Sequence, residues 1–499
     1  MSLHIDGKED PIAPTHNPHH TRRWSILGVL ALAQLMVVLD ATIVSIALPA
    51  AQHALHFSDN DRQWVVTAYT LAFGSLLLLG GRVGDLVGRK RALIAGLIGF
   101  AVASAIGGGA TSFGVLIAAR GLQGAFGALL APATLSLLTT SFTEEDERGK
   151  AFGIYGAVSG GGAAVGLLLG GLLTEYVSWR WCLYVNLLLV LPTVLGAAAL
   201  LHNQVEEHRP THDLAGAITG TTGLLVLVYG FSCAETHGWG SAITLGFLAA
   251  GLLLLAAFVA VERRVAHPLL PLRVVLDRMR GGSLLVLLFI GSGLFSVFLF
   301  LTYYLERTLG FSAVKTGLAF LPMVAATAIT SWLSSTYLQR RLGEKPLAVA
   351  GMAIAAVGMA LLTRLGVQSS YATDVLPPLA IFAAGLGFAF PALTNGATDR
   401  IEHEDAGVGS AMVNVTQQIG ASLGIALLTT IFTSAVNVYL ADKPHTRAVA
   451  ANAAVHGYTV SFWWSATLFL VGTLIAATVL RRRPATRSAE LTTPEYETT

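Results

Sequence analysis

An aspartate inside the first long apolar segment of the chain is the residue most able to do chemistry. Asp40 lies in the run LDATIVSIALP, within an apolar stretch from residue 24 to residue 48. A charged side chain at the centre of a membrane-spanning helix costs roughly 2.5–3.5 kcal/mol on insertion scales, so an intramembrane carboxylate marks a functional site by default. The chemistry open to an isolated carboxyl group is the binding and release of a proton.

An arginine lies at matching depth in another apolar segment. Arg120 follows Phe113 by seven residues, and Asp40 precedes Leu48 by eight. At 1.5 Å per residue, these offsets place both side chains about 10–12 Å from the same membrane face. A nearby cation favours the charged carboxylate, whereas desolvation disfavours it. The pair therefore fits either proton coupling or a static ion pair that holds the helices together, and both interpretations stay open.

The composition places these residues in a membrane protein. Of 499 residues, 54% are apolar and 12% are charged, against roughly 25% charged in soluble proteins. Two cysteines, Cys182 and Cys233, exclude a disulfide framework, and a net charge of +2 with dispersed basic residues argues against a nucleic-acid partner. We find no nucleotide-binding loop and no catalytic motif. We therefore expect neither an enzyme nor a bound metal or cofactor.

Fourteen apolar segments are long enough to cross about 30 Å of hydrocarbon. They are residues 24–48, 63–81, 92–110, 113–138, 152–173, 181–201, 214–232, 242–261, 283–303, 314–338, 347–365, 376–395, 408–432 and 459–480. The sequence thus predicts an all-α polytopic membrane protein. The expected parts are a disordered cytoplasmic tail (1–23), a six-helix bundle (24–201), two additional helices (214–261), a second six-helix bundle (283–480) and a cytoplasmic tail (481–499).

A weak internal repeat and the distribution of basic residues give the orientation. LVGRKRALIAG, around Gly88, recurs in outline as RLGEKPLAVAG, around Gly343, as in transporters built from two related bundles. Most of the 31 Lys and Arg fall inside the cell if the amino terminus does. Because basic loops mark the cytoplasmic side, we expect both termini in the cytoplasm, a plasma-membrane location and a single chain as the functional unit.

The run GRVGDLVGRKR, from Gly81 to Arg91, resembles the signature loop of the major facilitator superfamily. Gly81 allows close helix approach and Gly88 permits a tight turn. Asp85 can accept hydrogen bonds from a helix N-terminus or from Arg89. We interpret these four residues as a gate motif at the cytoplasmic end of the second helix.

Further runs resemble the fourteen-helix drug:proton antiporter branch of that superfamily. They are LDATIVSIALP in the first helix, LIAARGLQGAFGA in the fourth, SWRWCLYVN after the fifth and DAGVGSAMVNVTQQIGASLG in the thirteenth. The resemblance covers nearly the whole chain. It implies that the first and fourth helices line a central cavity, where Asp40 and Arg120 could pair directly or through water.

The fifth helix departs from the pattern of that branch. Leu167 follows Gly166 where the branch has a proline, so the expected kink is missing, which weakens the case for exchange. The glycines remain and predict a small-residue face for close packing. These antiporter-motif glycines are Gly156, Gly160, Gly166, Gly170 and Gly171.

Four polar residues are candidates for substrate contact: Gln123, Glu306, Asn414 and Gln418. Asn414 and Gln418 share a helix face at i, i+4 and fit hydrogen bonding between helices equally well. Glu306 fits a second protonatable or cation-attracting site, or a solvated acid at the interface.

Aromatic residues on the second and ninth helices allow two interpretations. Trp64 and Tyr69, with Phe295, Phe298 and Phe300, fit either an aromatic drug-binding wall or a lipid-facing belt.

These features together predict proton-driven export of hydrophobic or cationic small molecules by alternating access, with the bilayer, protons and the exported molecule as partners. Proton-coupled uptake of a small solute is the alternative that Leu167 keeps open. A membrane-embedded enzyme is disfavoured, because no paired catalytic groups share a helix face.

Overall fold

The structure is a computed structural model. It describes residues 22–58, 61–142, 144–202, 213–265, 268, 270, 272–399, 406–441, 443–444 and 446–481. The expected tails lie outside these residues except at their inner ends, Arg22 and Arg23 at the start of the chain and Arg481 at its close. The disorder expected of the tails therefore stays a prediction.

Long helices account for almost all of the described residues, which contain no strand. They are α1 (Arg23–Leu55), α2 (Arg62–Val87), α3 (Arg89–Gly108), α4 (Phe113–Ser141), α5 (Glu145–Tyr176), α6 (Trp181–Leu200), α7 (Leu214–His237), α8 (Ala242–Glu262), α10 (Arg278–Tyr303), α11 (Ala313–Leu333), α13 (Glu344–Leu362), α14 (Leu376–Ala397), α15 (Ala406–Leu440) and α16 (Arg447–Val479). Each overlaps one predicted apolar segment. Short elements complete the fold: α9 (Leu272–Val275), α12 (Gln339–Leu342) and the π-helical turns η1 (Tyr304–Thr308), η2 (Ser334–Leu338) and η3 (Tyr371–Val375).

Within the described residues, 12 helices are long and apolar enough to cross a membrane. The chain is thus an all-helical, multi-pass membrane protein, whereas a count of fourteen crossings stays a prediction. The two predicted spans outside this count are α2 and α7; in α7 the described apolar stretch is Ala215–Phe231. Helix α2 packs against α4, α15 and α7.

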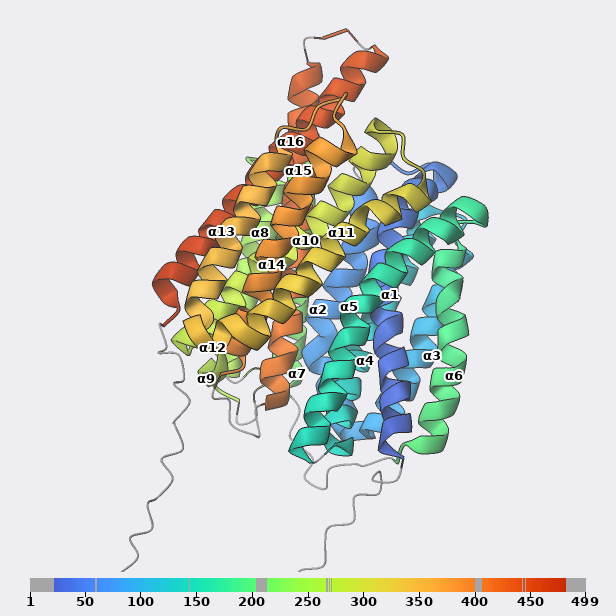
Figure 1. Cartoon of the computed structure of the whole chain (residues 1–499), viewed down its shortest axis with the longest axis vertical. Helices are drawn as coiled ribbons and strands as arrows, with labels where there is room; N and C mark the ends of the chain where they lie inside the picture. The colour runs from blue at the N-terminus through green and yellow to red at the C-terminus, as the bar shows by residue number, and fades with distance from the viewer. Residues whose placement is uncertain are drawn as a thin grey trace, which may run out of the picture.

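The long helices alternate in direction, so both ends of the described chain lie at one end of the molecule (Figure 1). We call this the proximal end, and the opposite end, where α1 finishes and α2 begins, the distal end. Helices α1–α6 pack mainly on one another, as do α10–α16. We refer to these two groups as the N-half and the C-half. Between them, α7 and α8 pair with each other, and α7 also contacts α2 and α15.

Several helices begin where a short polar side chain accepts from the free amides of the first turn. Ser112 caps α4, Ser241 caps α8 and Ser312 caps α11. Asp277 caps α10 by accepting from the amides of Arg280 and Met279, and these hydrogen bonds lower the pKa of its carboxyl group. The caps therefore define the residues at which these helices begin.

The internal repeat is visible in the backbone of two turns. Gly88 joins α2 to α3 with φ 94°, and Gly343 joins α12 to α13 with φ 78°. Both values lie in a region that side chains with a Cβ rarely adopt. The two related sequence runs thus form equivalent glycine turns at the proximal end of the two halves.

The last two helices are longer than the apolar pattern predicted. We expected segments 408–432 and 459–480, but α15 continues to Leu440 and α16 begins at Arg447. The added turns form a hairpin that projects beyond the rest of the distal end (Figure 1). Hydropathy missed it because its sequence is polar, although its alanines favour helix.

Three of the aromatic residues are helix-packing residues, which corrects their predicted lipid-facing role. The side chains of Tyr69, Phe298 and Phe300 are buried in the protein interior. Phe300 packs 5.7 Å from Phe432 and Phe298 packs 5.2 Å from Phe320, measured between ring centroids. An aromatic drug-binding wall stays a prediction.

Candidate functional site

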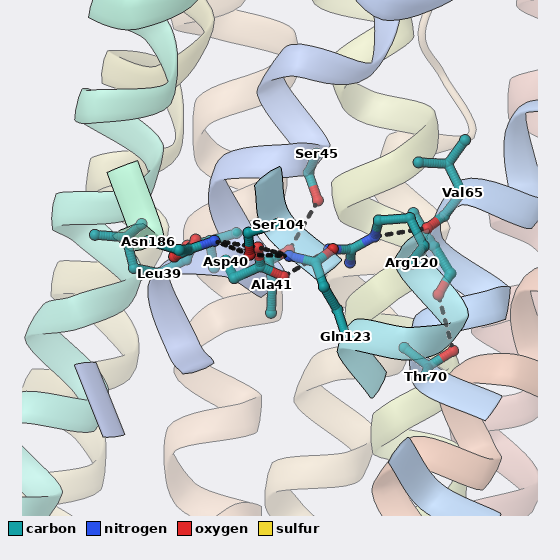
Figure 2. A network of polar contacts seen from close by, with 12 residues as sticks. Leu39, Asp40, Ala41, Ser45, Val65, Thr70, Ser104, Arg120, Gln123 and Asn186 are labelled. Atoms are coloured by element: carbon teal, nitrogen blue, oxygen red, sulfur yellow. Dashed lines mark hydrogen bonds and ion pairs between the residues drawn. The ribbon is translucent and has the colours of Figure 1, made fainter. Parts of the chain in front are cut away.

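Asp40 lies in the middle of α1 at the centre of a buried polar network, with 0% of its surface exposed. Three side chains donate to its carboxylate. Arg120 Nη1 lies 2.6 Å from Oδ2, while Gln123 Nε2 and Asn186 Nδ2 lie 3.0 Å and 2.8 Å from Oδ1. Figure 2 shows Asp40 between Asn186 on one side and Arg120 on the other. Helices α1, α4 and α6 therefore meet at one carboxylate.

Arg120 is held by hydrogen bonds from Nε and Nη1 and by an aromatic ring. Besides Asp40, its Nη1 donates to Gln123 Oε1 at 2.8 Å, and its Nε donates to the backbone carbonyl of Val65 at 3.1 Å (Figure 2). The guanidinium carbon also lies 4.4 Å from the ring centroid of Tyr69, a cation–π contact. Because Val65 and Tyr69 belong to α2, Arg120 connects the aspartate of α1 to α2.

Asn186 and Ser104 were not predicted as site residues. Ser104, on α3, accepts from Gln123 at 2.7 Å and from Asn186 at 3.2 Å. Both residues are fully buried. A neutral polar residue in an apolar helix is a weak signal, because it can bond to its own backbone. The only hint for Asn186 was its position at the end of the SWRWCLYVN run.

The network gives both oxygens of the Asp40 carboxylate a hydrogen-bond donor and places Arg120 beside it. Breaking a buried ion pair by removing one partner is strongly destabilising, because the other charge is left uncompensated. A cavity beside Arg120, lined by apolar residues such as Val44 and Leu116, has a volume of about 10 Å³, close to the minimum for one water molecule. Exchange of a proton between Asp40 and solvent therefore requires the surrounding helices to move.

The structure describes three of the four gate-motif residues fully: Gly81, Gly88 and Arg89. Gly88 makes the expected turn, and Arg89 starts α3. The side chain of Asp85 lies outside the described residues, so its role stays a prediction. Close helix approach at Gly81 was wrong: a Cβ there would sit 3.6 Å from Pro132, an ordinary contact. The close approach occurs at Gly80, where a Cβ would collide with the backbone of Ala128.

The described antiporter-motif glycines of α5 divide into three groups. Gly166 and Gly170 face the turn of α1 around Asp40, since a Cβ at Gly166 would collide with the Thr42 side chain and a Cβ at Gly170 would press on Ile43. Gly171 faces α11, where its Cβ would lie 2.8 Å from Ala313 O. At Gly156 a Cβ would meet open space, which corrects the predicted packing role there. The surroundings of Gly160 lie outside the described residues.

The structure separates the four candidate substrate contacts. Gln123 is fully buried in the Asp40 network, so it does not reach an accessible cavity here. Gln418 lies where α15 meets Gly74 of α2, and Asn414 is exposed one turn earlier. Glu306 is half-buried in η1 at the distal end. Substrate contact by Asn414, Gln418 and Glu306 stays a prediction.

Comparison with known proteins fits this architecture. The family profile described as Major Facilitator Superfamily matches residues 30–425. The chain belongs to the major facilitator superfamily. Similar proteins include the puromycin resistance protein of Streptomyces alboniger, 50% identical over 461 residues that cover 92% of this chain and 90% of the relative. The cephamycin export protein of Amycolatopsis lactamdurans is 39% identical over 408 residues, which cover 81% and 84% of the two chains.

Solved structures show the same fold at low sequence identity. A bacterial homologue of the human lysosomal transporter Spinster, in an inward-facing and unoccupied conformation, superimposes with a TM-score of 0.62 at 15% identity, covering 91% of this chain and 96% of that one. The peptide transporter POT gives a TM-score of 0.63 at 14% identity over 91% and 93%.

Proposed function

We propose that this chain exports antibiotic-like hydrophobic or cationic small molecules across the plasma membrane in exchange for protons, by alternating access. The observation that carries the substrate class is the 50% identity, over 92% of the chain, to a protein named for puromycin resistance. Relatives named for export of cephamycin and of tetracenomycin C support the outward direction.

The Asp40 network supports the proton as the coupling ion. It holds a carboxylate in the middle of a membrane helix, and its partners come from α3, α4 and α6, so a change of protonation alters contacts among four helices. With the termini in the cytoplasm, protons would reach Asp40 from the distal, outer side and leave at the proximal side. A single chain contains the whole network.

The test is transport of puromycin into inverted membrane vesicles with an imposed proton gradient. If drug is exchanged for protons, puromycin should accumulate inside the vesicles against its gradient while protons move out of them. Movement of drug and protons in the same direction would replace export by uptake as the function, the alternative that Leu167 had kept open. A drug panel that shows no gradient-dependent movement at all would contradict the substrate class.

A further inference from the structure

We propose that Arg62, Tyr303 and Phe432 form a distal latch between the two halves, and that Arg120 transmits the state of Asp40 to this latch through the first two turns of α2. The inference deepens the proposed function, since it says how the Asp40 site controls the opposite end of the molecule. Arg62 is thereby assigned as a positioning residue for the transport cycle.

The latch is a cation between two aromatic rings. Arg62 is the first residue of α2, and only 1% of its surface is exposed. Its guanidinium carbon lies 4.2 Å from the ring centroid of Tyr303 on α10 and 4.8 Å from that of Phe432 on α15. Cation–π contacts are strongest where water is excluded. The N-half thus inserts a buried cation between two rings of the C-half.

Hydrogen bonds from the C-half to Gln52 of α1 reinforce the same contact. Tyr303 Oη donates to Gln52 Oε1 at 2.7 Å, and Arg307 Nη2 donates to the same oxygen at 2.9 Å. Gln52 Nε2 donates to the carbonyl of Phe57 at 3.2 Å, which fixes the orientation of the amide. Tyr303 is therefore held by α1 and α2 together. Opening of the distal end must separate Tyr303 from both helices.

The contact between the two halves continues from the latch along α2 toward the middle of the molecule. Farther along α2, Thr70 and Ser422 of α15 share a hydrogen bond of 2.8 Å, and Gly74 packs on Gln418. Rocking of the halves about this middle region leaves those contacts largely in place but moves Arg62 away from Tyr303. The latch is thus placed where opening displaces it most.

Arg120 connects the latch to the aspartate. The carbonyl that accepts from Arg120 Nε belongs to Val65, one turn after Arg62, and the ring under the guanidinium group belongs to Tyr69, two turns after Arg62. Arginine stays charged at all accessible pH values and bonds through a rigid planar fork. When Asp40 takes a proton, the buried cation loses its counter-charge, and its reorientation must move or release the first turns of α2.

Few other titratable groups face Asp40 among the described residues. Arg120 reaches it from α4 and Tyr69 from α2, while Cys182 of α6 lies near it with its thiol directed at Gly170 O. Tyr69 and Cys182 are neutral in the physiological range. Arg120 is therefore the charged group through which a change at Asp40 acts.

The experiment measures the distal opening directly, without drug or proton gradient. Spin labels are attached to cysteines placed at two exposed distal positions, Ala54 of α1 and Val438 of α15, in full-length protein in which Cys182 and Cys233 are replaced by alanine and transport is retained. We expect Arg62→Leu to raise the ratio of distally open to closed molecules on the order of tenfold. Arg62→Lys, which keeps a cation over the rings, should restore most of the closed population.

Two further comparisons test the connection to the proton site. Asp40→Asn alone should raise the open population, and combined with Arg62→Leu it should add little, because both act on the same contact. Arg364→Leu is the matched control, since Arg364 is an exposed distal arginine of the C-half. Unchanged distances in folded Arg62→Leu protein would overturn the latch, and fully additive effects would overturn the connection. Neither result depends on whether the exported molecule has been identified correctly.

Discussion

The two halves of the molecule share a fold and an internal repeat but bury different chemistry. In the N-half, the buried polar side chains include the acidic and basic residues Asp40, Arg62 and Arg120. In the described part of the C-half, the buried polar side chains are hydroxyls, such as Ser296 and Ser465, which donate to their own helix backbone. Under the proposed function, the N-half would therefore hold the proton switch, and the C-half would be the neutral partner against which the N-half moves.

The largest effect should come from uncoupling the ion pair, which decides between a switch and a static ion pair. Arg120→Gln leaves the Asp40 carboxylate without a buried counter-charge, so the free energy of unfolding should fall by about 3–5 kcal/mol. Asp40→Asn combined with Arg120→Gln should recover most of that stability. Thermal unfolding and gradient-driven transport are measured on the same preparations. Recovery of transport together with stability would show that the pair is only structural.

The second effect concerns the contact between α5 and α1. Gly170→Leu should stop export, because its Cβ would lie 3.1 Å from Ile43 O, on the turn that follows Asp40, and overpacking of this kind displaces backbone. Gly156→Leu is the control, since the added side chain meets open space. Initial rates of drug transport should separate the two variants. An equal loss of transport rate in Gly170→Leu and Gly156→Leu would mean that a larger side chain anywhere in α5 impairs transport, which would contradict a specific role for the α1 contact.

These contacts show how far the sequence could predict the site. Asp40 and Arg120 stood out because an ionised residue is rare in an apolar helix. Asn186 and Ser104 did not, because the rotation of α6 and α3 about their axes decides whether a neutral side chain meets the carboxylate. Hydropathy located the helices well. The signature-loop motif, however, gave the close glycine contact of α2 to Gly81 instead of Gly80, because the rotation of α2 about its axis decides which of two adjacent glycines faces α4.

The contacts between the halves were the least predictable part. Arg62 directly precedes the apolar segment 63–81, where an arginine is expected to face water or lipid headgroups. Its burial depends on Tyr303 and Phe432, which are more than 200 residues away in the sequence. Pairings of that kind come from the docking of two bundles and have no local periodicity.

A smaller effect should follow from removing one neutral donor from the network. Asn186→Ala leaves Asp40 with Arg120 and Gln123, so stability should fall by about 1–3 kcal/mol and transport by about tenfold. Asn452→Ala, at an exposed asparagine of α16 that bonds to Ala448 O, should change neither. An Asn186→Ala variant that transports at the normal rate would remove Asn186 from the switch.

The smallest effect distinguishes two glycines of the gate motif. Gly88→Ala should lower the free energy of unfolding by about 1 kcal/mol, because φ 94° is strained for a residue with a Cβ. Gly81→Ala should be close to neutral, since its Cβ makes an ordinary contact with Pro132. Chemical denaturation of both variants gives the comparison. A larger loss at Gly81 would place the essential close approach there after all.

Proton movement on addition of drug tests the central claim most directly. Protein in liposomes with a pH-sensitive dye inside should release protons in the direction opposite to puromycin movement, and Asp40→Asn should abolish this signal while leaving exchange of labelled for unlabelled drug. Such a result would make Asp40 the proton site of an exporter. A normal proton signal in the Asp40→Asn variant would contradict the account, because the N-half would then have no switch at the carboxylate.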